Sequence, residues 1–170
     1  SGSLSNNTLT QGNNTLQSTS GWRWRPSTIC ASSGKYYAEF KPTSGGNIYT
    51  VIGVTPQVSW DSIDGETIGA GSGSEAESVG FSQAGSAIKG NSTVYSGSTY
   101  TTNDIIGVPT SGSTGTGAVS LSSTLSDWSI SVSSAGSTIS CNYGNGYFGT
   151  TQVSSAGTNA SGNGIFEYDV

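Results

Sequence analysis

The chain has 170 residues and a formal net charge of −5, with only five Lys and Arg residues and no His. So few cations argue against a nucleic-acid partner, because phosphate neutralisation needs clustered Lys and Arg, and no apolar run is long enough for membrane insertion. Only 9% of the residues are charged and 26 are Gly, yet aromatic and β-branched residues occur throughout. This combination predicts a folded all-β protein with many small-residue turns rather than a disordered chain.

The clearest strand signals lie in the first third of the chain. Residues 34–42 alternate, so that Tyr36 and Phe40 face one side while Glu39 faces the other. Residues 47–56 form a nearly continuous run with many β-branched residues, typical of a strand that is covered on both faces. The TSGG segment between them predicts a hairpin-type connection.

The rest of the chain continues this pattern of short strands and Gly- and Ser-rich turns. A second short hairpin is predicted around Ala84 and Gly85. Strands are predicted at 78–83, 86–90, 92–97, 104–109, 117–123, 128–134, 137–144 and 164–170.

No stretch shows sustained helical periodicity, and no shift in composition marks a second domain. Many short strands without helices predict an antiparallel β-sandwich. We therefore expect one domain over residues 1–170, with residues 1–20 as an extended N-terminal arm.

The two cysteines leave two alternatives open. Cys30 and Cys141 lie far apart in the sequence, each in a strand-like segment. They could form a disulfide that ties the first strands to the last, or they could remain two buried free thiols, because the geometry of a bridge is spatial.

Catalytic chemistry is difficult to assemble from these residues. Without His, the commonest general base and a Ser-His-Asp relay are missing, so no catalytic residue and no cofactor is predicted. The WDSIDGE segment offers Trp60 with Asp61, Asp64 and Glu66, which is the one acidic cluster that invites a paired-carboxylate or calcium site. It lacks the spacing of an EF-hand loop, and the favoured interpretation is an acidic turn on a solvated loop.

Aromatic side chains remain the best candidates for ligand contact, because Trp and Tyr offer large, rigid surfaces with a polar handle. Tyr143 and Tyr147 lie among glycines after a strand, where exposure of at least one is expected. Trp60 and Tyr95 complete the candidate ligand-binding set. Trp128 and Tyr36, on alternating strands, are expected to be buried.

Several segments resemble SPRY-type domains, which are concanavalin-like β-sandwiches, in their bacteriophage and virus-encoded form. The similar segments are SGKYYAEF with the following IGV strand, residues 79–108, and the closing stretch from 137 to 170. Their order along the chain is more specific than any one of them. After the second IGV the chain departs from the family pattern, since PTSGSTGTG follows where the family continues into a strand and hairpin. Either this segment replaces them, or a segment is missing between Val108 and Ala118.

The resemblance implies a non-catalytic structural or surface module of a virion, a capsid decoration protein or a tail or fibre component. Its partners would be other virion proteins or copies of itself, with attachment to a host-surface glycan or receptor as a further role. Binding would use loops at one end of the sandwich, and residues 56–77, 109–117 and 149–163 are the candidate loops. The alternative is a secreted, extracellular carbohydrate-binding module.

Overall fold

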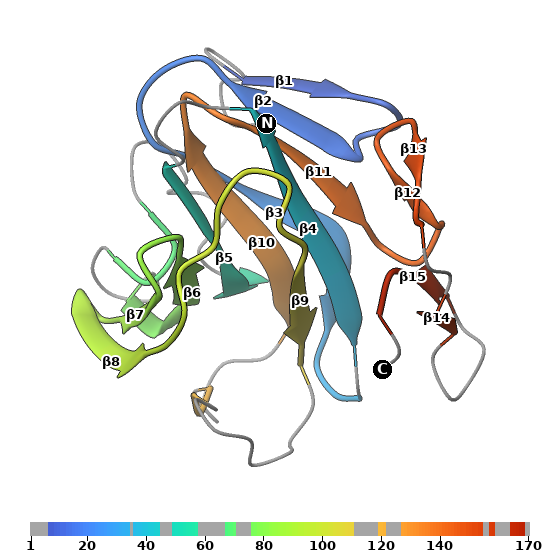
Figure 1. Cartoon of the computed structure of the whole chain (residues 1–170). Coiled ribbons are helices and arrows are strands. Elements are labelled where there is room, and N and C mark those ends of the chain that lie inside the picture. Colours follow the sequence, from blue (N-terminus) through green and yellow to red (C-terminus); the bar gives the residue numbers. More distant parts are fainter. Residues whose placement is uncertain are drawn as a thin grey trace.

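The computed structural model describes residues 7–34, 36–44, 49–57, 67–70, 76–110, 119–121, 127–154, 157–158 and 164–168. Two antiparallel sheets face each other, which confirms the predicted sandwich (Figure 1). In spatial order the first sheet contains β1 (Asn7–Thr10), β2 (Thr15–Ser18), β11 (Thr138–Asn142), β4 (Tyr37–Ser44) and β9 (Ile106–Pro109). The second sheet contains β3 (Arg23–Ala31), β10 (Trp128–Ala135), β5 (Tyr49–Pro56), β6 (Val79–Ser82), β7 (Ser86–Lys89) and β8 (Ser92–Ser96).

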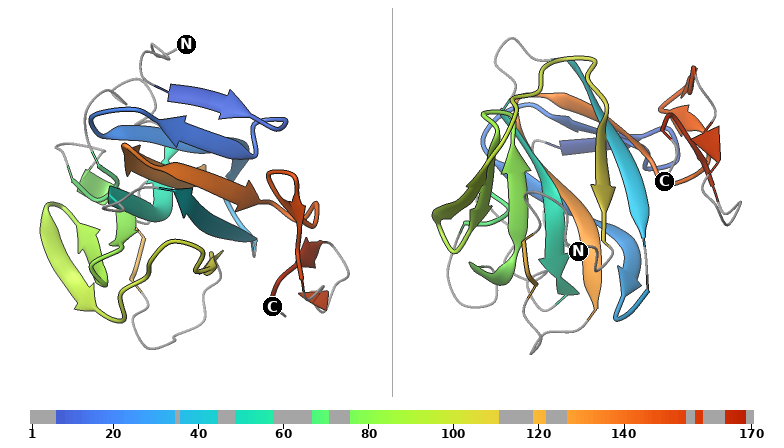
Figure 2. Two further views of the ribbon diagram at one scale, coloured as in Figure 1. Left: turned by 45° about the horizontal axis from the view of Figure 1, so that its top comes forward. Right: turned by 60° about the horizontal axis from the view of Figure 1, so that its bottom comes forward.

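Two small hairpins lie together beside the first sheet, near the C-terminal end of the described chain (Figures 1 and 2). One pairs β12 (Tyr147–Phe148) with β13 (Thr151–Gln152), and the other pairs β14 (Gly157–Thr158) with β15 (Ile165–Phe166). They bring the final described residues, 164–168, against β4 and β11 of the first sheet.

The main core lies between the sheets and follows from strand alternation. Residues two apart on β4, β10 and β11 point to the same side, and these apolar sets meet in one cluster. Its members include Ala38, Phe40, Ile130, Val132, Ile139 and Cys141. A second, smaller cluster contains Trp24, Val51 and Ile68, with Trp22 packed against it.

The predicted hairpin between residues 34–42 and 47–56 is wrong. β4 pairs with β9 and β11 in the first sheet, whereas β5 pairs with β6 and β10 in the second. Turn residues mark where a strand ends but do not fix its partner, and here the connection crosses between sheets. The predicted β6–β7 hairpin is confirmed.

The N-terminal region also differs from the expected extended arm. Residues 7–18 form the β1–β2 hairpin, and β2 extends the first sheet by pairing with β11. The turn between its strands uses left-handed Gln11, Gly12 and Asn13.

Simple alternation misplaces one residue of the 34–42 segment and leaves the burial of another unpredicted. Tyr36, expected in the core, lies just before β4 and is 41% exposed. Glu39, on the face opposite Phe40, is fully buried although it is charged. Alternation predicts which face a side chain takes, but what covers that face depends on distant segments.

The cysteines are both free thiols. Cys30 lies half-buried on β3 of the second sheet, and Cys141 lies buried on β11 of the first. Burial raises the pKa of the Cys141 thiol to about 12. Burial, with a smaller contribution from the charge of Asp127, also raises the pKa of Cys30.

Candidate binding pocket

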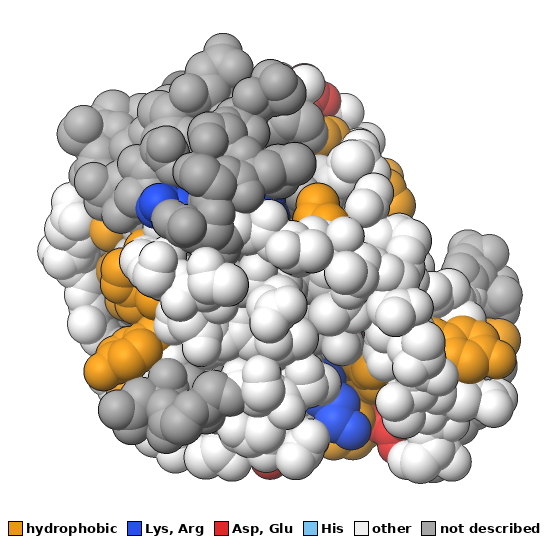
Figure 3. Space-filling view, turned by 90° about the horizontal axis from the view of Figure 1, so that it is seen from above, with side chains coloured by type: hydrophobic (Ala, Val, Ile, Leu, Met, Phe, Trp, Pro, Cys, Tyr) orange, Lys and Arg blue, Asp and Glu red, His pale blue; other side chains and the backbone are white. Residues whose placement is uncertain are grey.

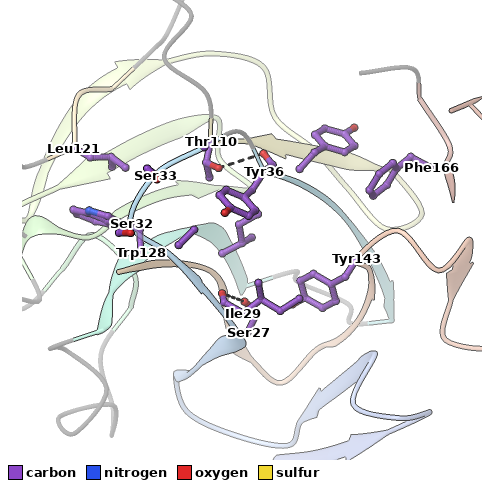
Figure 4. Close-up of a pocket in the computed structure, with 14 residues that line it drawn as sticks. Ser27, Ile29, Ser32, Ser33, Tyr36, Thr110, Leu121, Trp128, Tyr143 and Phe166 are labelled. Atoms are coloured by element: carbon purple, nitrogen blue, oxygen red, sulfur yellow. Dashed lines mark hydrogen bonds between the residues drawn. The ribbon is translucent and has the colours of Figure 1, made fainter. Parts of the chain in front are cut away.

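A pocket of about 390 Å³ opens where the two sheets separate at one end of the sandwich (Figure 4). Its volume falls within the range typical of small-ligand sites, roughly 300–1,000 Å³. In Figure 4, Trp128 and Leu121 lie on one side of it, and Tyr143 and Phe166 lie on the other.

An irregularity in β3 shapes one wall. Cys30 pairs with Ser129 and Pro26 with Ser131, so residues 27–29 of β3 lie opposite the single residue Ile130 of β10. Such a bulge bends its strand away from the partner, and Pro26 lacks the N–H that a regular ladder would use. The bulge leaves Ile29 58% exposed at the pocket.

A second wall comes from the segment that leads into β4. The Thr110 amide donates to the Tyr36 carbonyl at 2.8 Å, which joins the end of β9 to the start of β4. Gly34 lies against the Tyr36 ring, since a Cβ at this glycine would come within 3.3 Å of it. Tyr36 is thereby placed at the pocket with its ring partly open to solvent.

The described lining is aromatic and aliphatic, with a few hydroxyls and no charged side chain. Five aromatic residues line it: Tyr36, Tyr37, Trp128, Tyr143 and Phe166. Besides the phenol groups of the tyrosines, aliphatic hydroxyl groups come from serines and a threonine: Ser27, Ser32, Ser33 and Thr110. Such a lining favours an uncharged group, because a charge placed there would lose its hydration without gaining a partner.

Tyr143 reaches the pocket from the core rather than from a free loop. Its ring meets Phe40 edge-on at 6.1 Å between centroids. Burial and, to a smaller extent, the adjacent Cys141 raise the pKa of Tyr143 well above its ordinary value. Tyr143 is therefore a fixed, neutral wall.

The Phe166 wall belongs to the tail, by which we mean residues 164–168. Phe166 is buried and its ring meets Tyr37 edge-on at 4.9 Å. Two consecutive tail amides donate to Glu39: Glu167 to Oε2 at 2.9 Å and Tyr168 to Oε1 at 3.0 Å. The tail is thus attached to the outer face of β4.

Asn142 completes the attachment and explains the glycines that follow it. Its Nδ2 donates to Glu39 Oε2 at 3.1 Å and to the Ile165 carbonyl at 2.9 Å. Its Oδ1 accepts from the amides of Gly144 and Gly146, at 2.9 and 3.1 Å. Both glycines have left-handed φ angles, 100° and 81°, which other residues rarely adopt.

The structure separates the candidate ligand-binding residues. Tyr143 lines the pocket. Tyr147 is exposed on β12 but does not line it, and Tyr95 lies half-buried on β8 at the far edge of the second sheet. Trp60 and the acidic candidates Asp61, Asp64 and Glu66 lie outside the described residues.

Sequence reasoning missed most of the pocket. The sequence patterns do not single out Ile29 or Leu121, and they predict that Tyr36 and Trp128 lie in the core. Trp128 is partly buried and packs against the core while lining the pocket. The proline inside a strand-like segment at position 26 was the one available signal of an irregular edge.

The described residues contain neither a metal-binding cluster nor a membrane-spanning helix. Within these ranges, no cluster of three His, Cys, Asp or Glu side chains is arranged to hold a metal ion. Nor do they contain a helix with the length and apolar character needed to cross a bilayer.

No protein-family model and no curated protein matches the chain. Among solved structures, 24 chains match its fold. One is the SPRY domain of human HERC1, with a TM-score of 0.59 and 16% identity, covering 79% of this chain and 91% of that one. At this identity the similarity concerns the fold, and the chain adopts a SPRY-like β-sandwich.

Proposed function

We propose that the protein is a non-catalytic interaction module that binds a partner protein through the pocket at the end of its sandwich. The observation that supports this proposal is the uncharged pocket with Ile29 and Tyr36 exposed beside it. Exposed apolar side chains around a concave site are typical of interaction surfaces. The group that best fits is an uncharged aromatic or aliphatic side chain on a partner segment without acidic residues close by, because the chain carries a net charge of −5.

We propose a virion as the setting, as a capsid decoration or a tail or fibre component, whose partners are other virion proteins or copies of the same chain. The sequence resemblance to phage-encoded SPRY-type domains supports this setting. A surface of uncharged polar groups suits a particle exposed to water, and the described part of the face in Figure 3 is mostly of this kind. Repetition on a symmetric particle would turn weak pocket contacts into avidity.

A gold-labelled antibody against the domain, imaged on purified virus particles and on cells of the source culture, tests the setting. Label over the shell supports decoration, and label at the tail end supports host attachment. Label confined to cells or to the culture fluid contradicts the virion setting.

The role of the pocket is tested by rebinding. Particles stripped of the protein are offered the wild-type chain, Ile29→Asp, or the control Val94→Asp, whose side chain is similarly exposed on distant β8. We expect only Ile29→Asp to lose rebinding, because it places a charge in the uncharged pocket. Equal rebinding by all three proteins would show that the pocket is not the contact.

The alternative function is carbohydrate binding, favoured by the meeting of aromatic rings with hydroxyl groups in one pocket. Host-surface glycans or, for a secreted module, structural polysaccharides would be the ligands. Screening the full chain on a glycan array tests it. Binding to one glycan that Ile29→Asp abolishes would support this alternative over a protein partner.

A further inference from the structure

Glu39 is a buried carboxylate that does not itself line the pocket, yet it holds the segment that forms one pocket wall. Four donors surround it: the Glu167 and Tyr168 amides, Asn142 Nδ2 and the Tyr37 hydroxyl, at distances from 2.9 to 3.3 Å. In the described part of the chain, no ion pair joins it to Lys or Arg.

These neutral donors are what makes the burial of Glu39 tolerable. Removing a carboxylate from water is costly unless hydrogen bonds replace its hydration, and bonds to a charged acceptor are stronger than bonds between neutral groups. Two of the four donors belong to the tail. Because the carboxylate needs the tail amides and the amides need an acceptor, the two stabilise each other.

The position of Phe166 is directly linked to this attachment. Phe166 precedes Glu167 in the chain, is only 4% exposed and lines the pocket. Its ring rests on Tyr37, whose hydroxyl donates to the same carboxylate. Movement of residues 167 and 168 away from Glu39 would therefore carry Phe166 away from the pocket.

We propose that Glu39 is a positioning residue for the pocket: it fixes the Phe166 wall through the Glu167 and Tyr168 amides and so sets the affinity for an apolar group. The proposal rests on the proposed function of the pocket. A purely structural Glu39 would change the stability of the fold and leave the affinity of the folded protein unchanged.

Glu39→Gln in the full chain provides the test. Glutamine keeps the shape but replaces one acceptor oxygen with an NH₂ donor, which would face two of the present donors. The probe is para-fluorobenzyl alcohol, an uncharged aromatic molecule followed by fluorine NMR, with para-fluorobenzoate as its anionic counterpart. Hydrogen exchange of the tail amides gives a second readout that needs no ligand.

We expect wild-type protein to bind the alcohol and to discriminate against the benzoate. In Glu39→Gln the alcohol should bind roughly fivefold more weakly, and the Glu167 and Tyr168 amides should exchange at least about tenfold faster. The matched control is Glu77→Gln, whose carboxylate pairs with Lys89 on distant β7, and it should change neither quantity.

A thermodynamic cycle with Phe166→Ala separates positioning from general destabilisation. If Glu39 acts through the Phe166 wall, Glu39→Gln should have little further effect on probe affinity in the Phe166→Ala background. Additive effects of the two substitutions would overturn the proposal. So would unchanged probe affinity together with protected tail amides in Glu39→Gln.

Two other outcomes remain informative. If the wild-type protein binds neither probe, the proposed apolar role of the pocket fails. The positioning role is tested separately: unchanged hydrogen exchange of the tail amides in Glu39→Gln would overturn it. If Glu39→Gln does not fold, Glu39→Asp keeps the charge but withdraws it by one methylene. The same two shifts, smaller in size, are then expected, and their absence would overturn the proposal.

Discussion

Two neighbouring cross-strand pairs of the first sheet are equally buried, although one pair is apolar and the other is polar. On the inner face, Phe40 of β4 lies opposite Cys141 of β11, and on the outer face Glu39 lies opposite Asn142. Each of the four side chains is at most 3% exposed. The inner pair packs between the sheets, whereas the outer pair is covered by the tail.

This contrast explains how one wall of the pocket is held in place. The inner pair needs only shape and apolar surface, so neighbouring residues along two strands can provide it. The outer pair needs donors and acceptors in the right places, and these come from residues up to 129 positions away in sequence. Polar burial has thereby fixed a distant segment at the edge of the pocket.

The largest expected effect comes from the inner pair. Phe40→Ala should lower the free energy of unfolding by about 3–5 kcal/mol, because it removes a fully buried ring and leaves a cavity. Urea denaturation measures the change. Tyr36→Ala is the control, since this exposed ring near the start of the same strand should cost only about 0.5 kcal/mol. Similar losses for both would contradict the placement of Phe40 in the core.

A substitution in the outer pair should lower the free energy of unfolding somewhat less. Asn142→Ala removes four hydrogen bonds: Glu39 Oε2 loses one of its two donors, and the amides of Gly144 and Gly146 lose this acceptor. We therefore expect a loss of about 2–3 kcal/mol in the free energy of unfolding. Denaturation of Asn145→Ala is the comparison, because among the described residues this exposed side chain makes a single hydrogen bond, to the nearby Tyr147 amide. Equal, small losses would mean that the outer network adds little to stability.

Alkaline pH should destabilise the fold through the inner pair, because that pair contains the buried thiol of Cys141. The pKa of Cys141 is raised by burial from its ordinary 9.0 to about 12, so the folded state keeps a proton that the unfolded state releases. Its contribution to stability is complete below pH 9.0 and is lost progressively as pH rises from there towards about 12.

Removal of the buried thiol should therefore flatten the alkaline decline. Unfolding free energies measured across this range should fall less steeply for Cys141→Ala than for wild type, by up to about 1.4 kcal/mol per pH unit. Cys30→Ala, from the half-buried thiol on the other sheet, should flatten the curve less. Parallel curves for wild type and Cys141→Ala would contradict the burial of this thiol.

The smallest effect on stability is expected outside both pairs. Ile29→Asp and Val94→Asp alter exposed side chains, so each should change the free energy of unfolding by about 0.5 kcal/mol or less. Only Ile29→Asp should weaken binding of the fluorinated alcohol, because Val94 lies on β8, away from the pocket. Equal binding by the two variants would place the apolar site elsewhere.

Much of the fold could be predicted from local patterns. The alternation that contains Phe40 identified a core strand, and the continuous apolar run at 47–56 identified a strand buried on both faces, as observed for β5. The pairing of β4 could not be predicted, since its partners β9 and β11 lie far along the chain. The residues of a short turn do not determine whether the chain turns back within one sheet or crosses to the other.

The pocket was the part that local patterns predicted least. Tyr143 was identified because aromatic residues among glycines stand out, but Tyr147, which carries the same signal, points elsewhere. Ile29 is exposed only because β3 bulges opposite Ile130, and that register is set by the partner strand.

Local sequence patterns are sufficient to predict an all-β sandwich, because side-chain alternation and turn residues act over a few positions and need no distant partner. The burial of Glu39 and the position of Phe166 in a pocket wall, by contrast, depend on long-range contacts in the folded chain. The physical reason is that a buried charge is acceptable only where distant groups supply its hydrogen bonds. Here the backbone amides of Glu167 and Tyr168 supply these hydrogen bonds, and the residue types in the sequence do not show which backbone amides will do so.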